Sequence, residues 1–116
     1  MLRDKGVILI RSEEEMKVSV KRNKDILYLY LEGELDQSVA GDLRGKIDDY
    51  IAAAKVKNVV FNMEKLTFMD STGVGLILGR YKKLKSENVG LFIDKPNPQI
   101  DKVLRVSGLY GIIPKL

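Results

Sequence analysis

Short strand-like runs alternate with segments of helical spacing from residue 26 onward, and this order restricts the fold. The runs are rich in β-branched and aromatic residues, and they cover residues 26–32, 56–64 and 88–95. The helical segments repeat apolar residues every three or four positions, and they cover residues 37–55, 71–85 and 97–107. Strand–helix–strand units join parallel neighbours through right-handed crossovers. The sequence therefore predicts an α/β domain with a mixed, mostly parallel sheet of four to five strands.

A β-hairpin is predicted before this alternation begins. Val18 and Val20 alternate with polar residues, and the run that starts at residue 26 is also strand-like. The polar stretch Asn23–Asp25 supplies the turn between them, and Gly33 is expected to end the second strand. The complete order of elements is then β-β-α-β-α-β-α-β.

Polar residues and glycines mark where the helices begin and end. Ser38 is a candidate N-cap for the helix at 37–55, because serine hydroxyls accept hydrogen bonds from free N–H groups of the first turn. Asn97 followed by Pro98 predicts the start of the last helix, and Gly108 its end. Residues 110–116 are then expected to form a final short strand.

The composition excludes several classes of function. The chain has no cysteine and no histidine, which excludes disulfides, thiolate metal sites, most zinc sites and serine–histidine catalysis. The net charge of +4 is scattered and aromatic residues make up only 7%, so no nucleic-acid surface is indicated. No apolar run approaches the roughly 18 residues of a membrane span. We therefore expect a cytoplasmic domain that contacts neither nucleic acid nor membrane.

The junction between the strand at 56–64 and the next helix carries an unusual set of residues, Asp70, Ser71, Thr72 and Gly73. The first turn of a helix has unpaired N–H groups and a partial positive charge. One interpretation is that an acid or hydroxyl here only caps the helix. The other is that Ser71 accepts a phosphate, which a helix N-terminus tolerates well, so that the modification acts on a partner and not on the fold.

Two glycines lie within the helix that follows, although each costs about 1 kcal/mol relative to alanine in a helix interior. A helical wheel places Gly75 and Gly79 beside Leu76, opposite the apolar stripe that covers the sheet. They then form a shallow notch that a partner's backbone can approach closely. Alternatively, the glycines face a packed element that needs small residues. The periodicity alone leaves both interpretations open.

Sequence motifs for catalysis are missing. The glycines around Gly75 do not have dinucleotide-binding spacing, and the chain contains neither a P-loop nor a serine-hydrolase elbow. Asp36, Glu64 and Asp70 are the carboxylates that could cluster for acid–base work or Mg²⁺, but each is better explained as a cap or turn residue. We expect no catalytic residues, no metal and no cofactor.

Three segments, at residues 68–85, 29–36 and 103–113, together give the chain a family resemblance. The motif Asp-Ser-Thr-Gly-Val-Gly after an apolar strand, with Gly-Glu-Leu-Asp at the end of the hairpin, resembles bacterial anti-sigma factor antagonists of the STAS domain family, particularly its sporulation-stage members. The resemblance covers residues 16–116 and implies helices packed mainly on one face of the sheet. Residues 1–15 are expected to be an N-terminal extension, with Met16 as the natural start.

The resemblance also implies a function. Such antagonists bind an anti-sigma factor that is also a serine kinase. This binding frees the sigma factor in sporulation or stress responses. The kinase phosphorylates the serine after the aspartate, here Ser71, and a PP2C-type phosphatase resets it. Thr72, where the family often has serine, is a rival acceptor. The implied partner-binding residues are Gly33, Asp36, Asp70, Thr72, Gly73, Gly75, Leu76 and Gly79. The alternative is a STAS interaction or scaffold domain in a signalling complex that is not switched.

Overall fold

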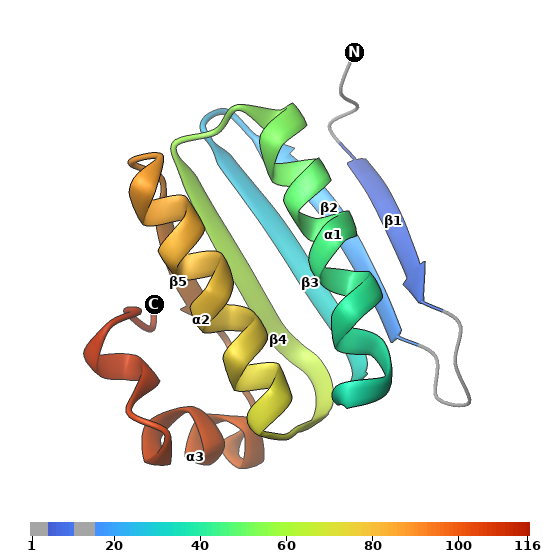
Figure 1. Cartoon of the computed structure of the whole chain (residues 1–116), viewed down its shortest axis with the longest axis vertical. Helices are drawn as coiled ribbons and strands as arrows, with labels where there is room; N and C mark the ends of the chain where they lie inside the picture. The colour runs from blue at the N-terminus through green and yellow to red at the C-terminus, as the bar shows by residue number, and fades with distance from the viewer. Residues whose placement is uncertain (1–4, 11–15) are drawn as a thin grey trace.

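The computed structural model describes residues 5–10 and 16–116 (Figure 1). The strands are β1 (Lys5–Ile10), β2 (Met16–Asn23), β3 (Ile26–Leu35), β4 (Asn58–Met69) and β5 (Gly90–Asp94). The helices are α1 (Gln37–Ala54), α2 (Ser71–Ser86) and α3 (Pro98–Val106), followed by the 3₁₀ turn η1 (Leu109–Gly111). The hairpin, the three helices and the α/β alternation predicted from the sequence are confirmed.

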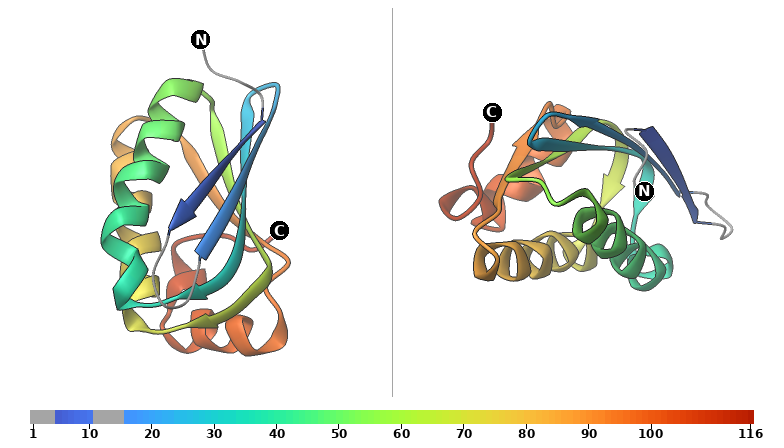
Figure 2. Two further views of the ribbon diagram at one scale, coloured as in Figure 1. Left: turned by 90° about the vertical axis from the view of Figure 1, so that its right-hand side faces the viewer. Right: turned by 90° about the horizontal axis from the view of Figure 1, so that it is seen from above.

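The five strands form one mixed sheet in the order β1-β2-β3-β4-β5. β2 pairs antiparallel with both β1 and β3, whereas the pairings of β3 with β4 and of β4 with β5 are parallel. The parallel pairings are those joined through α1 and α2, as crossover connections require. Both of these helices cover the same face of the sheet, and α3 lies at one end (Figures 1 and 2).

The core lies between this face and the two helices. Alternate residues of the hairpin point into it, and the fully buried ones include Val18, Leu27, Leu29 and Leu31. The residues between them, such as the exposed Tyr30, lie on the opposite face. The hairpin therefore buries one side only, which is the arrangement that a period-two pattern of apolar and polar residues produces.

The fifth strand is not the one expected. Residues 110–116 form part of η1 and then a single bridge between Lys115 and Ile93, whereas Lys5–Ile10 supplies the edge strand β1. Asp101 of α3 holds the C-terminal segment, because its carboxylate accepts a hydrogen bond from Tyr110 at 2.6 Å and pairs with Lys115 at 3.1 Å. These two hydrogen bonds hold the pKa of Asp101 below its usual range. The expected strand is thus reduced to one bridge, in which the Ile93 N–H donates to the Pro114 carbonyl at 3.0 Å and the Leu116 N–H donates to the Ile93 carbonyl at 2.8 Å.

Two strands run farther than expected and end together. β3 continues past Gly33 to Leu35, and β4 continues past residue 64 to Met69. Gly33 does not end its strand but lies at an irregularity in the pairing with β4, with φ of +111°. Leu35 pairs with Met69, so α1 and α2 start from adjacent strand ends. This shared edge carries the candidate site.

Candidate functional site

The two helix starts at this edge are built in the same way. Asp36 precedes α1 and Asp70 precedes α2, and both have extended backbones with φ/ψ of −121°/−174° and −108°/−170°. The Asp36 carboxylate accepts hydrogen bonds from the backbone N–H of Ser38 at 2.9 Å and from its hydroxyl at 2.6 Å. The prediction that Ser38 caps α1 was therefore wrong, because the carboxylate one residue before the helix takes that role.

Asp70 caps α2 through two backbone groups. Its Oδ1 accepts hydrogen bonds from the N–H of Thr72 at 2.9 Å and of Gly73 at 3.2 Å. Ser71 is the first residue of the helix, its side chain is exposed, and its hydroxyl donates to no other described residue. The capping requirement of α2 is therefore met by Asp70, and the Ser71 hydroxyl is free for another use.

The pairing of β3 with β4 brings the other predicted residues toward this point. Because Leu35 pairs with Met69, Asp36 and Asp70 follow directly from neighbouring strand ends. Gly33 lies farther back on β3, where its carbonyl accepts a hydrogen bond from the Thr67 hydroxyl at 3.0 Å. The edge thus combines two helix N-termini, two carboxylates and the hydroxyls of Ser71 and Thr72.

Gly73 is buried and does not belong to a surface. A Cβ atom at this position would lie 2.7 Å from Cγ of Met69 and 3.0 Å from the carbonyl oxygen of Leu35. Side chains essentially never approach so closely, so α2 needs a glycine here to pack against the end of β3. The expectation that Gly73 contacts a partner is corrected to a role in packing.

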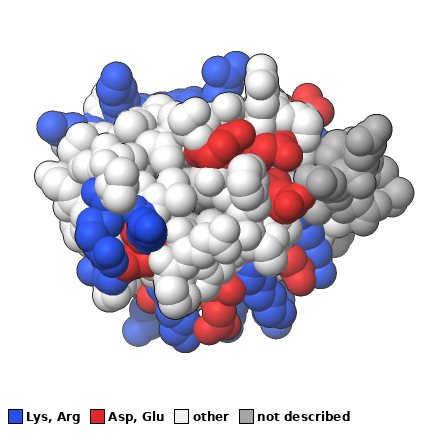
Figure 3. Space-filling view, turned by 90° about the horizontal axis from the view of Figure 1, so that it is seen from below, with Lys and Arg blue, Asp and Glu red and all other residues white. Residues whose placement is uncertain are grey.

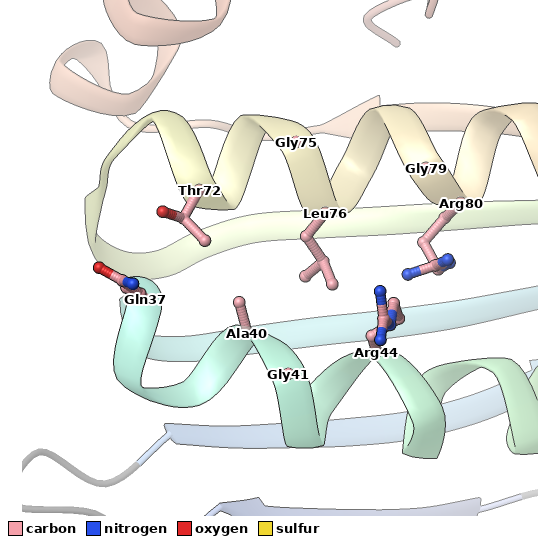
Figure 4. A pocket seen from close by; sticks show the side chains of 9 residues that line it. All are labelled: Gln37, Ala40, Gly41, Arg44, Thr72, Gly75, Leu76, Gly79 and Arg80. Carbon is pink, nitrogen blue, oxygen red and sulfur yellow. The ribbon is translucent and has the colours of Figure 1, made fainter.

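Gly75 and Gly79 face open space, which resolves the alternative that the sequence left open. A Cβ at either position would meet no atom within 4 Å. Both line a groove of about 480 Å³ between α1 and α2 (Figure 4), together with Gln37, Ala40, Gly41, Arg44, Thr72, Leu76 and Arg80. Leu76 does not point outward as the helical wheel suggested, because it is only 7% exposed against α1. It belongs to the wall of the groove.

Ser71 itself lines a different hollow, between α2 and α3, which the sequence did not reveal. This hollow has a volume of about 520 Å³, and its other lining residues are Met69, Asp70, Val74, Lys102, Val103, Val106 and Ser107. Val106 is 78% exposed although it is apolar. Seen from this end, the molecule has a broad uncharged area bordered by acidic and basic side chains (Figure 3). Ser71 and Thr72 therefore face hollows on opposite sides of α2.

The three carboxylates that the sequence offered for catalysis do not form a cluster. Asp36 and Asp70 cap helices, and Glu64 lies exposed on β4. Within residues 5–10 and 16–116, no three His, Cys, Asp or Glu side chains gather closely enough to hold a metal ion. No helix in the described part of the chain is long and apolar enough to cross a membrane.

A sequence profile of the STAS domain matches residues 17–116. The chain belongs to the STAS domain family. Among its relatives are the anti-sigma F factor antagonists of Paenibacillus polymyxa, 31% identical over 85% of each chain, and of Lysinibacillus sphaericus, 37% identical over 74% of each chain. These relatives support the resemblance drawn from the motifs at residues 29–36 and 68–85.

Solved structures of the anti-sigma factor antagonist SpoIIAA share the fold of this STAS domain. The structure of its unphosphorylated form has a TM-score of 0.73 and 32% identity, covering 85% of this chain and 87% of SpoIIAA. The structure of the phosphorylated form from Bacillus has a TM-score of 0.66 at the same identity, covering 85% of this chain and 90% of SpoIIAA. SpoIIAA therefore exists in both states, and the present STAS domain matches each.

Removing the cap of α2 is expected to destabilise this STAS domain without unfolding it. Asp70→Ala loses both hydrogen bonds to the first turn, so the free energy of unfolding should fall by about 1 kcal/mol. Chemical denaturation measures this change. Asp49→Ala, an exposed acid within α1, is the control and should change stability by less than about 0.5 kcal/mol. Equal stability of the two variants would contradict the capping role.

Proposed function

We propose that this protein is an anti-sigma factor antagonist: it binds an anti-sigma factor, and that binding frees a sigma factor that acts in sporulation or a stress response. The observation that carries the proposal is the exposed Ser71 hydroxyl directly after the capping Asp70, in a STAS domain whose relatives are anti-sigma factor antagonists. It is a binding protein without catalytic residues, it acts in the cytoplasm, and residues 16–116 form the binding domain. Residues 1–15 are an extension to it.

Phosphorylation of Ser71 is proposed to switch this binding off. The anti-sigma factor is itself the serine kinase, and a PP2C-type phosphatase removes the phosphate. A phosphoserine adds roughly −1.5 to −2 charges. It would stand beside the carboxylates of Asp70 and Asp36, at the start of a helix whose dipole tolerates anions. The fold is then kept, while the surface becomes strongly negative and repels the partner.

The proposed contact surface lies on both sides of Ser71. The groove between α1 and α2 provides Thr72, Gly75 and Gly79, and the hollow between α2 and α3 provides exposed apolar area at Val106. Asp36, Asp70 and Gly33 complete it at the strand ends. A partner that spans both hollows must cover Ser71, so a phosphate there is placed where it blocks the contact.

The direct test is to map phosphate after incubation with the purified cognate anti-sigma factor and ATP. We expect mass spectrometry to find one added phosphate on Ser71, none on the Ser71→Ala variant, and one on Thr72→Ala. Phosphate on Thr72 would reassign the acceptor, because the two hydroxyls are neighbours in the first turn. No added phosphate under conditions in which the anti-sigma factor binds would favour a STAS scaffold domain that is not switched.

A further inference from the structure

Arg80 is a buried cation whose hydrogen-bonding groups are not satisfied. The residue is only 8% exposed, and among the described residues its Nε and Nη1 have no hydrogen-bond partner. Nε lies 2.8 Å from Oδ1 of Asp48, close enough for a charge pair but not aligned for a hydrogen bond. Asp48 also pairs with Lys83 at 3.6 Å. Buried polar groups are nearly always paired in folded proteins, so the free Nη1 requires an explanation.

A second cation faces Arg80 across the groove between α1 and α2. Arg44 of α1 and Arg80 of α2 point toward each other (Figure 4). Burial lowers the pKa of Arg80; Asp48 opposes this shift, and the Arg44 cation adds to it. Two guanidinium groups that face each other repel unless an anion lies between them. The Asp48 carboxylate pairs with both Arg80 and Lys83, so it does not balance the positive charges of Arg44 and Arg80 in this part of the groove.

The groove is shaped for a polypeptide segment. The groove has no side chain at three positions in its lining, where a Cβ would meet no atom within 4 Å. These positions are Gly41, Gly75 and Gly79. Ala40 and Leu76 add an apolar wall. A backbone that lies over the glycines can direct a short acidic side chain inward, and arginine binds carboxylates through two parallel hydrogen bonds.

We propose that the groove between α1 and α2 accepts an acidic side chain of the protein partner, whose carboxylate bridges Arg44 and Arg80. The identity of the partner as the anti-sigma factor rests on the proposed function. The groove begins at Thr72, next to Ser71, so an acid seated in it holds the partner against the phosphorylation site. Arg44 and Arg80 are then specificity-determining residues of the interface.

Binding of the purified, cognate anti-sigma factor to wild-type protein and variants tests the proposal. Arg44→Gln is expected to weaken the affinity about tenfold, because Arg44 is exposed on α1 and its loss removes half of the carboxylate site. Arg80→Lys keeps the positive charge but loses the planar guanidinium that can donate two parallel hydrogen bonds, so it should weaken the affinity similarly. Lys46→Gln removes the same charge from an exposed site outside the groove and is the matched control. Equal affinities of Arg44→Gln and Lys46→Gln would overturn the proposal while leaving the antagonist function intact.

A second measurement does not depend on the partner. Sodium acetate is titrated into the full chain and followed by NMR at the Arg80 Nε–H and the Gly79 amide, with sodium chloride of equal concentration as the control. A saturable shift with acetate alone, reduced in Arg44→Gln, supports the carboxylate site even if no anti-sigma factor binds and the proposed function fails. If acetate causes no shift beyond that seen with sodium chloride, the proposal is overturned. A shift with inorganic phosphate but not with acetate also overturns it, in favour of a phosphate-bearing ligand.

Discussion

Ser71→Glu is expected to weaken binding of the anti-sigma factor by on the order of 100-fold, because like charges brought together in an interface cost several kcal/mol. The glutamate adds a negative charge at the first residue of α2, beside Asp70 and between the two hollows that flank the helix. Isothermal titration calorimetry with the purified, cognate anti-sigma factor measures the effect. Ser71→Ala should bind as the wild type does and should not be released by ATP.

The stability of Ser71→Glu has to be measured together with its binding, because the proposed switch changes the surface and not the fold. The free energy of unfolding of Ser71→Glu should stay within about 0.5 kcal/mol of the wild type, because an exposed acid at a helix N-terminus is tolerated. Ser86→Glu adds the same charge at the other end of α2 and should leave binding nearly unchanged. If Ser71→Glu bound as tightly as Ser86→Glu, or if it unfolded, the surface switch at Ser71 would be wrong.

The glycines of α2 are expected to respond in opposite directions to the same substitution. Gly73→Ala places a methyl group 2.7 Å from Met69 Cγ and 3.0 Å from the Leu35 carbonyl oxygen, so the first turn must move away from β3. We expect a loss of about 1–3 kcal/mol in the free energy of unfolding, the usual cost of overpacking. Gly75→Ala meets no atom within 4 Å and should instead gain about 0.5–1 kcal/mol from the better helix former.

Urea denaturation of the two variants gives this comparison directly. A shift of the midpoint without a change of slope identifies a change in stability and not in the unfolded state. A stabilised Gly73→Ala would show that the contact with β3 relaxes without cost. A destabilised Gly75→Ala would mean that the groove between α1 and α2 is closed by side chains in solution.

The sequence predicted the helices and strands more reliably than the contacts that they make with one another. The hairpin, the three helices and the start of α3 at Pro98 were correct, because periodicity and capping residues are local properties. The strand expected at residues 110–116 is reduced to one bridge with Ile93, because the chain first turns through η1 and Asp101 binds Tyr110 and Lys115, contacts that no local pattern signals. The wheel misplaced Leu76 because α2 packs on two neighbours, the sheet and α1, and a single apolar stripe describes only one of them.

By itself the sequence determined the α/β order, the lack of histidine and cysteine chemistry, and the junction where Ser71 follows Asp70. Only the tertiary structure placed Asp36 beside Asp70, separated the buried Gly73 from the open Gly75, and brought Arg44 to face Arg80. The physical reason is that helical periodicity fixes which residues share a face of a helix. What that face meets depends on strand register and on packing between segments distant in the chain.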